Sequence, residues 1–218
     1  MYGPLRGGLW RVRPPRVRRF FGTSSSLMAE LEVQEASNHV YHVQLNRPDR
    51  RNTFTLDLWK NMKTVFDELA EEPKCRAIVI SGIGKSFCAG IDLQQGMGEV
   101  NIGIAADVGT LNRIQKIVAN DSWTRELAFT ARDVGADEAL KFGLISRIFS
   151  TQESVVEGAL ALAERIVKKS PIAVQGTKVV LNHARDHAVQ ESLDFVKTWE
   201  YESVTVYRFA TECSCCHK

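Results

Sequence analysis

The pattern of apolar and polar residues predicts a chain that begins with alternating strands and helices and continues mostly as helices. Apolar-rich runs at residues 39–45 and 76–81 predict two strands, the first of which ends where Pro48 interrupts regular structure. Between them, residues 55–71 carry apolar side chains at helical spacing, with Thr55 as a suitable N-cap. This order predicts an α/β fold.

Helical spacing dominates the second half of the chain. The predicted elements are helices at 122–132 and 136–142, a strand at 144–149, a helix ending near Lys169, a helix beginning at Pro171, and another over 188–207. Ser150 and Glu153 have the spacing of a capping box for the helix that ends near Lys169. Its expected inward-facing residues are Val155, Val156, Ala159, Leu160, Ala163, Ile166 and Val167.

Charge is distributed unevenly along the 218 residues. The first 29 residues hold six arginines and no acid, whereas the rest of the chain has 22 basic and 26 acidic residues. A leader rich in arginine and ending in serines, without a long apolar run, predicts a mitochondrial transit peptide over 1–29 and a location in the mitochondrial matrix. A disordered basic tail is the alternative reading. The slightly acidic remainder predicts no nucleic-acid partner.

Neither a membrane span nor a metal site is expected. No window approaches the roughly 18 consecutive apolar residues that a membrane helix needs. Five cysteines are present, but three of them crowd the last six residues as CSCC before His217, without a spaced pair that could surround an ion.

The segment KSFCAGIDL at residues 85–93 is the first candidate for chemistry, because it follows a predicted strand. The small residues Ala89 and Gly90 allow a tight turn, after which the backbone N–H of Ile91 can point at a ligand and polarise a carbonyl. An ordinary turn into a helix, with Asp92 as its cap, is the alternative reading of the same residues.

Several segments together carry a resemblance to a known family. HVQLNRPDRRNTF, RAIVISGIGKSFCAGIDL, IAADVGTLNRI, ELAFTAR and ADEALKFGLISRIF occur in this order and resemble the crotonase (enoyl-CoA hydratase/isomerase) superfamily over roughly residues 38–200. The resemblance implies a crotonase-like spiral of ββα units with a helical C-terminal region. It also implies an acyl-CoA thioester as substrate, no separate cofactor, and assembly as a homotrimer or hexamer.

Site residues follow from the same resemblance. The backbone N–H of Ile91 matches one donor of the oxyanion hole that binds the thioester oxygen. Residues of the A-G-x-D segment would line the acyl-thioester site: Ala89, Gly90, Ile91, Asp92 and Leu93. The loop containing Arg51, Asn52 and Thr53 resembles the one that lies along the CoA moiety.

Two acids in the segment EVNIGIAADVG point to a subgroup. Glu99 and Asp107 match positions at which dienoyl-CoA isomerases carry acids, whereas hydratases usually keep only the glutamate. Moving a 3,5-diene to a 2,4-diene removes a proton from C2 and returns one at C6, so one carboxylate is needed at each end. We place Glu99 at C2 and Asp107 at C6, although the sequence leaves the reverse order open. Without the resemblance, both would be read as solvated loop acids.

The chain also departs from the family pattern. Members continue after the A-G-x-D segment with a helix, a further strand, a glycine-rich turn and more strands, whereas Gln94–Gly98 leads almost directly to Glu99. The missing block would contain the second oxyanion-hole glycine and a further acid of the dienoyl-CoA isomerases. The expected layout is a transit peptide at 1–29, a crotonase-like core at 38–120 shortened after residue 95, a helical region at 121–207, and an atypical tail at 208–218.

Three kinds of function stay open at this point. The first is a dienoyl-CoA isomerase of fatty-acid β-oxidation, with enoyl-CoA hydratase or 3,2-enoyl-CoA isomerase as the alternative within the enzyme class. The second is a catalytically dead variant that binds acyl-CoA or joins intact subunits. The third is a shortened product that does not fold stably.

Overall fold

Three strands form a single sheet in the order β1-β2-β3, with β1 at Leu31–Ser37, β2 at Val40–Leu45 and β3 at Ala77–Gly82. The structure is a computed structural model that describes residues 30–90 and 109–199. β1 and β2 are antiparallel, and β2 and β3 are parallel. The strands predicted at 39–45 and 76–81 are confirmed as β2 and β3. β1 was not predicted, although its apolar residues Leu31 and Val33 have the two-residue period of a half-buried strand.

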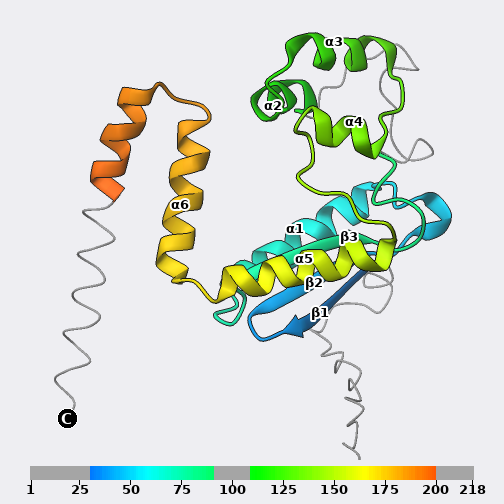
Figure 1. Cartoon of the computed structure of the whole chain (residues 1–218). Coiled ribbons are helices and arrows are strands. Elements are labelled where there is room, and N and C mark those ends of the chain that lie inside the picture. Colours follow the sequence, from blue (N-terminus) through cyan, green and yellow to red (C-terminus); the bar gives the residue numbers. More distant parts are fainter. Residues whose placement is uncertain (1–29, 91–108, 200–218) are drawn as a thin grey trace, which may run out of the picture. The chain divides into compact units, whose positions relative to one another are not determined.

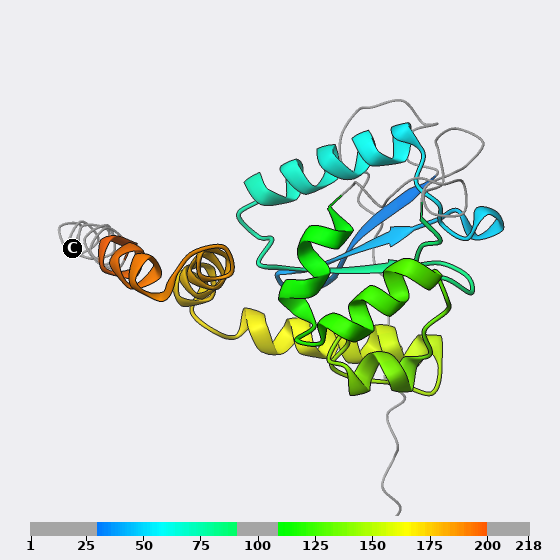
Figure 2. The same cartoon turned by 90° about the horizontal axis from the view of Figure 1, so that it is seen from above.

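Helix α1 (Leu56–Glu71) lies along one face of this sheet (Figures 1 and 2). The side-chain hydroxyl of Thr55 accepts a hydrogen bond from the Leu58 backbone N–H, so the predicted N-cap is confirmed. The buried core between helix and sheet consists of Leu31, Tyr41, Val43, Leu45, Leu58 and Leu69. Alternate residues of β2 supply half of this set, because side chains of a strand point to opposite faces in turn.

The other face of the sheet carries a buried polar pair. His42 Nε2 lies 2.8 Å from Ser81 Oγ, and His42 Nδ1 lies 3.4 Å from Gln34 Nε2. Burial lowers the pKa of His42, since an imidazolium would lose its hydration there. Burial therefore favours the neutral imidazole, whose two ring nitrogens contact residues of the strands on both sides of β2.

The chain divides into two units, residues 1–89 and 90–218. The second unit is helical in the part that the structure describes. Its helices are α2 (Thr110–Ile117), α3 (Asp121–Thr130), α4 (Ala136–Lys141), α5 (Gln152–Val167) and α6 (Pro171–Ala184), and residues 189–199 are helical as well. These positions confirm four predicted helices to within a few residues, and the fifth, predicted at 188–207, up to residue 199, beyond which the chain lies outside the described residues. Helix α2 was not predicted.

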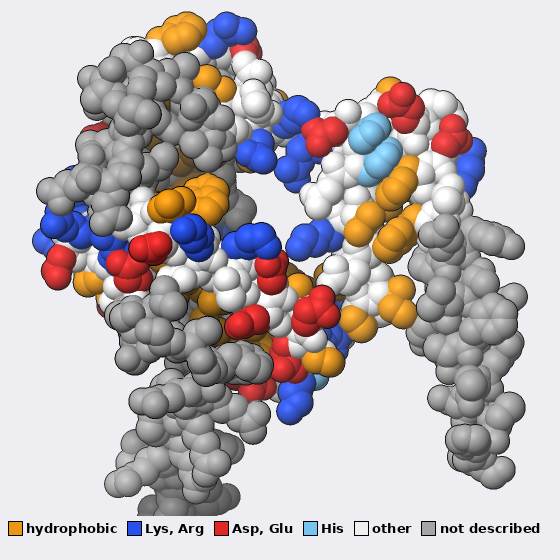
Figure 3. All heavy atoms as spheres, turned by 180° about the vertical axis from the view of Figure 1, so that it is seen from behind, with side chains coloured by type: hydrophobic (Ala, Val, Ile, Leu, Met, Phe, Trp, Pro, Cys, Tyr) orange, Lys and Arg blue, Asp and Glu red, His pale blue; other side chains and the backbone are white. Residues whose placement is uncertain are grey.

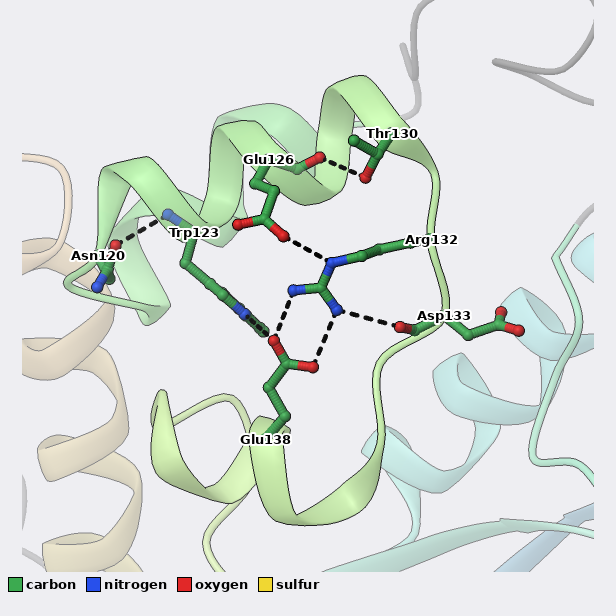
Figure 4. A network of polar contacts seen from close by, with 7 residues as sticks. All are labelled: Asn120, Trp123, Glu126, Thr130, Arg132, Asp133 and Glu138. Carbon is green, nitrogen blue, oxygen red and sulfur yellow. Dashed lines mark hydrogen bonds and ion pairs between the residues drawn. The ribbon is translucent and has the colours of Figure 1, made fainter.

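A charged network fastens α3 to α4 (Figure 4). The guanidinium of Arg132 donates to both carboxylate oxygens of Glu138, at 2.6 and 2.9 Å, and to Glu126 Oε1 at 2.7 Å. Trp123 Nε1 donates to the same Glu138 carboxylate at 2.8 Å. The hydrogen bonds from Arg132 and then Trp123 lower the pKa of Glu138 to about 2. Glu138 is thus the acceptor at which the two helices are joined.

The predicted strand at 144–149 is wrong. The backbone N–H groups of Leu144 and Ile145 donate to the Ala139 carbonyl, closing the end of α4 after Gly143, whose φ is +77°. The side chain of Phe149 lies against Gly158 of α5, where a β-carbon would collide with its ring. Residues 144–149 therefore contact helices. A strand needs a partner strand, and the described residues of this unit contain none.

The predicted capping box is displaced by one residue. Thr151, rather than Ser150, is the N-cap of α5, and its hydroxyl accepts from the Ser154 backbone N–H at 3.2 Å. The Ser154 hydroxyl accepts in return from the Thr151 backbone N–H at 3.1 Å. Ser154 therefore makes the reciprocal hydrogen bond of the capping box, which the prediction assigned to Glu153.

Helices α5 and α6 leave much apolar surface uncovered. Of the residues predicted to face inward on α5, only Ala163 is buried, and Val155 remains 46% exposed. Leu181 of α6 is 63% exposed, and hydrophobic side chains reach the surface of the segment that contains α6 in Figure 3. An open groove of about 460 Å³ lies between residues 143–149 and α5. Monomeric proteins rarely expose large apolar patches.

Candidate functional site

Two loops leave the sheet at the same edge in the first unit. Residues 46–55 follow β2, and residues 83–90 follow β3. Because β2 and β3 are parallel, with Leu45 opposite Gly82, both loops start side by side at the carboxyl ends of their strands. Ligand sites in α/β proteins commonly occur at this edge.

Asn52 connects the two loops. Its side-chain Nδ2 donates to the carbonyls of Ile83 at 2.9 Å and Ser86 at 2.8 Å. Its Oδ1 accepts from the Arg47 backbone N–H at 2.8 Å, and its own N–H donates to the Arg47 carbonyl at 2.9 Å. Asn52 is fully buried and has a φ of +55°, a conformation that asparagine tolerates better than most residues.

A second set of contacts holds the first loop in shape. Arg47 donates from Nη1 to the Thr53 carbonyl and forms an ion pair from Nε to Glu30 at 2.9 Å. The Arg51 carbonyl accepts from the Ala89 backbone N–H at 2.9 Å, which ties the far end of the second loop to the first. In the second loop, Ile83 and Ser86 are therefore bonded to Asn52, and Ala89 is bonded to Arg51.

Glycines make the close approach of the loops possible. A β-carbon on Gly82 would meet the Phe87 carbonyl oxygen and lie 2.6 Å from Asn52 Nδ2. A β-carbon on Gly84 would lie 2.9 Å from Pro48 Cβ, and the φ of Gly84 is +85°. Both positions exclude larger residues for steric reasons.

The outer side of the two loops is exposed. Arg50, Arg51 and Lys85 offer cationic groups that suit phosphate oxygens, and Phe87 offers an apolar ring with 55% of its surface exposed. Ala89 and Gly90 are exposed as well, and Gly90 has a φ of +97°. The Ala89 N–H is already bonded to the Arg51 carbonyl, so it is not a main-chain donor for a ligand.

The structure places five of the expected site residues. Arg51, Ala89 and Gly90 are exposed, Thr53 is partly buried, and Asn52 is fully buried. Because a fully buried amide offers no surface to a ligand, the expected contact of Asn52 with substrate does not fit its position. Residues outside the described part of the chain are Ile91, Asp92, Leu93, Glu99 and Asp107.

Sequence reasoning missed Arg47 and Gly82 as parts of this arrangement. Arg47 stands directly before Pro48 in the segment NRP, and Gly82 closes a buried strand. Both residues are visible in the sequence, but their contacts depend on the fold. Arg47 bonds to Asn52 and Thr53 and pairs with Glu30, and Gly82 lies close to Asn52, Ser86 and Phe87.

Neither metal ligation nor membrane crossing finds support in the described residues. Over 30–90 and 109–199, no three His, Cys, Asp or Glu side chains are grouped so that they could hold a metal ion. Three of the five cysteines lie outside these ranges. In the same part of the chain, no helix combines the length and apolar character that a membrane span requires.

Comparison with known proteins identifies the family. Residues 35–101 and 96–206 match the sequence model of the enoyl-CoA hydratase/isomerase family, described as Enoyl-CoA hydratase/isomerase. The chain belongs to this family. Among curated relatives, the mitochondrial Δ(3,5)-Δ(2,4)-dienoyl-CoA isomerase of Homo sapiens is 38% identical, over 78% of this chain and 73% of the human protein. The peroxisomal enzyme of that name from Arabidopsis thaliana is 28% identical, over 78% of this chain and 87% of the plant protein.

Solved structures confirm the predicted crotonase fold. Enoyl-CoA hydratase from Bacillus anthracis superposes with a TM-score of 0.74 at 22% identity, covering 81% of this chain and 91% of that one. EchA1 from Mycobacterium marinum, also an enoyl-CoA hydratase, gives a TM-score of 0.74 at 20% identity, covering 84% and 96%. Identities this low establish the fold, while the 38% identity to the human isomerase places the chain in an enzyme family.

The alignment with the human relative also shows that this family member is short. It extends over 240 positions, but 78% of 218 residues supplies only about 170 of them, so about 70 positions have no counterpart. The family sequence model matches in two pieces that meet at residues 96–101. Both findings agree with a segment missing shortly after the A-G-x-D motif.

Proposed function

We propose that this protein is a dienoyl-CoA isomerase of fatty-acid β-oxidation that converts 3,5-dienoyl-CoA into 2,4-dienoyl-CoA. The observation that carries the proposal is the 38% identity to the human enzyme of that name over 78% of the chain. A more general role, as a crotonase-family isomerase or hydratase, follows from family membership alone.

The proposed reaction moves two protons and no other atoms. Glu99 takes a proton from C2, and the electron pair of that C–H bond enters the conjugated system, with negative charge on the thioester oxygen. Asp107 then gives a proton to C6, which shifts the two double bonds to positions 2 and 4. CoA is part of the substrate, so the proposal requires no separate cofactor.

Binding is proposed to use the two loops. The backbone N–H of Ile91 would donate to the thioester oxygen while that oxygen carries the charge, and Ala89–Leu93 would line the acyl group. Arg51 and Thr53 lie on the loop proposed to follow the CoA moiety, and the exposed guanidinium of Arg51 suits its phosphates.

The test is a spectrophotometric assay of 2,4-dienoyl-CoA formation by the full chain. Asp107→Asn and Glu99→Gln are each expected to lower kcat by about 100- to 10,000-fold, the usual contribution of a positioned acid or base. Glu164→Gln serves as the control, because it makes the same change at an exposed residue of α5 and should keep wild-type activity. Wild-type activity in both acid variants would contradict the proposed roles.

A second candidate is a catalytically inactive protein that binds acyl-CoA. It is favoured by the roughly 70 positions that lack a counterpart, since the missing block would hold a second oxyanion donor. A folded chain that binds acyl-CoA but turns over neither 3,5-dienoyl-CoA nor 2-enoyl-CoA would favour this candidate. Hydration of 2-enoyl-CoA, measured in the same assays, would instead identify a hydratase.

Location and assembly are part of the proposal. The mitochondrial matrix is favoured by the arginine-rich residues 1–29 and by the mitochondrial relatives, whereas the plant relative is peroxisomal. We also propose a homotrimer or hexamer, since the exposed apolar residues of α5 and α6 would gain from cover. Light scattering of the purified chain measures the number of copies.

A further inference from the structure

Asn52 has no side-chain donor left for a ligand, and it is fully buried. An asparagine amide carries two N–H donors, and both are used, one on the Ile83 carbonyl and one on the Ser86 carbonyl. Its Oδ1 accepts from Arg47, and none of the residue is exposed. The chemistry of this side chain is therefore directed entirely at the protein backbone.

The backbone that Asn52 binds leads directly to the proposed thioester site. Ile83 and Ser86 lie in the loop that continues to Ala89, and the Ala89 N–H is bonded to Arg51, the neighbour of Asn52. Between these points the loop has no helix or strand to hold it. Two consecutive residues of the preceding loop therefore bind it at three points, in addition to the Ile83 N–H bond to the Leu45 carbonyl and the packing of Cys88 against the core.

We propose that Asn52 is a positioning residue that fixes the loop of residues 83–89, and thereby the direction in which the main chain presents its donors to the thioester. This inference rests on the proposed function for its catalytic consequence, but the attachment of the loop can be measured independently. Displacement of a donor by about 1 Å can cost on the order of 100-fold in rate without loss of binding contacts elsewhere.

Asn52→Asp is the sharpest variant. It keeps the size, the Oδ1 acceptor and the tolerance of positive φ, but it replaces the two N–H donors with an oxygen facing two carbonyl oxygens. Asn182→Asp is the matched control, because Asn182 is exposed on α6 and its Oδ1, the atom that the substitution keeps, accepts a hydrogen bond from Arg185. If Asn52→Asp does not fold, Asn52→Gly removes the amide and still permits the backbone conformation.

The experiment combines hydrogen exchange with kinetics on the full chain. The amides of residues 83–89 are expected to exchange at least tenfold faster in the Asn52 variants than in the wild type and Asn182→Asp. With 3,5-dienoyl-CoA, kcat is expected to fall about 10- to 100-fold while KM changes little, the signature of a donor lost mainly from the transition state.

The outcomes separate the two proposals. Unchanged exchange at residues 83–89 in a folded Asn52 variant would overturn the positioning role, whatever the activity. Faster exchange with unchanged kcat would also overturn it, since the attachment of the loop would then have no effect on catalysis. If the wild type lacks activity but the variants exchange faster, the attachment stands and the isomerase proposal fails.

Discussion

Gly82 shows how strongly one residue without a side chain constrains the candidate site. A β-carbon at this position would lie 2.6 Å from Asn52 Nδ2 and closer still to the Phe87 carbonyl oxygen. Asn52 Nδ2 is held by hydrogen bonds to the Ile83 and Ser86 carbonyls, so it cannot move away without losing them. The close approach of the two loops therefore depends on glycine here.

Gly82→Ala is expected to destabilise the protein by about 1–3 kcal/mol, the usual cost of forcing an extra methyl group into packed surroundings. The free energy of unfolding in urea measures this. Gly135→Ala is the control, because a β-carbon at Gly135 meets nothing within 4 Å and its φ of −73° suits alanine. Equal stability of both variants would contradict the steric account.

At the residue scale, sequence could find the loop but not the role of each member. The segment NRPDRRNTF places Arg51, Asn52 and Thr53 together, and the resemblance assigned all three to substrate. Whether a side chain points outward or into the fold depends on partners distant in sequence, in this case Ile83 and Ser86. Local sequence does not contain that information.

Among the elements, the junction of α3 and α4 depends on the ionisation of Glu138. Its pKa is lowered to about 2 by Arg132 and Trp123, against about 4.3 for an unfolded glutamate. A lowered folded-state pKa means that the stabilisation is complete above about pH 4.3 and is lost as the pH falls toward 2. Acid should therefore loosen this junction.

Glu138→Gln is expected to lower the thermal midpoint at pH 7 and to bring it much closer to that of the wild type near pH 2.5. At that pH the unfolded wild type has taken up a proton on Glu138, so most of the extra stability of the ionised folded form is lost. Near-ultraviolet circular dichroism between pH 7 and 2.5 follows the transition. Glu157→Gln, at an exposed position of α5, should keep the wild-type dependence. Parallel midpoint curves for Glu138→Gln and wild type would show that the junction does not depend on this carboxylate.

Long periodic elements were predictable, and short or context-dependent ones were not. The helical spacing of α1 and α5 extends over 16 residues each, which leaves little ambiguity. Residues 144–149 have the composition of a strand, but a strand also needs an edge with which to pair. Helix α2 has only eight residues, and its N-cap, Gly109, makes no side-chain capping hydrogen bond. The sequence therefore contains no clear sign of where this helix begins.

On the scale of the whole molecule, the chain belongs to the enoyl-CoA hydratase/isomerase family and supplies fewer residues than its human relative to their alignment. About 70 positions of the human relative have no counterpart, and α5 and α6 keep apolar residues such as Val155 and Leu181 exposed. Loss of neighbouring elements leaves apolar surface that another copy of the chain could cover. Sequence comparison predicted the missing segment, whereas the exposed helix faces emerged only from the structure.

Binding of an acyl-CoA thioester tests the central claim most directly, because every proposed activity requires it. The measurement is the thermal midpoint of the full chain with octanoyl-CoA, a saturated thioester that cannot be isomerised, beside octanoate alone. We predict that octanoyl-CoA raises the midpoint with increasing concentration, corresponding to about 2.7 kcal/mol at 100 times Kd, and that octanoate does not. If millimolar octanoyl-CoA leaves the thermal midpoint of the folded chain unchanged, the proposed role of the loops at residues 46–55 and 83–90 in acyl-CoA binding is contradicted.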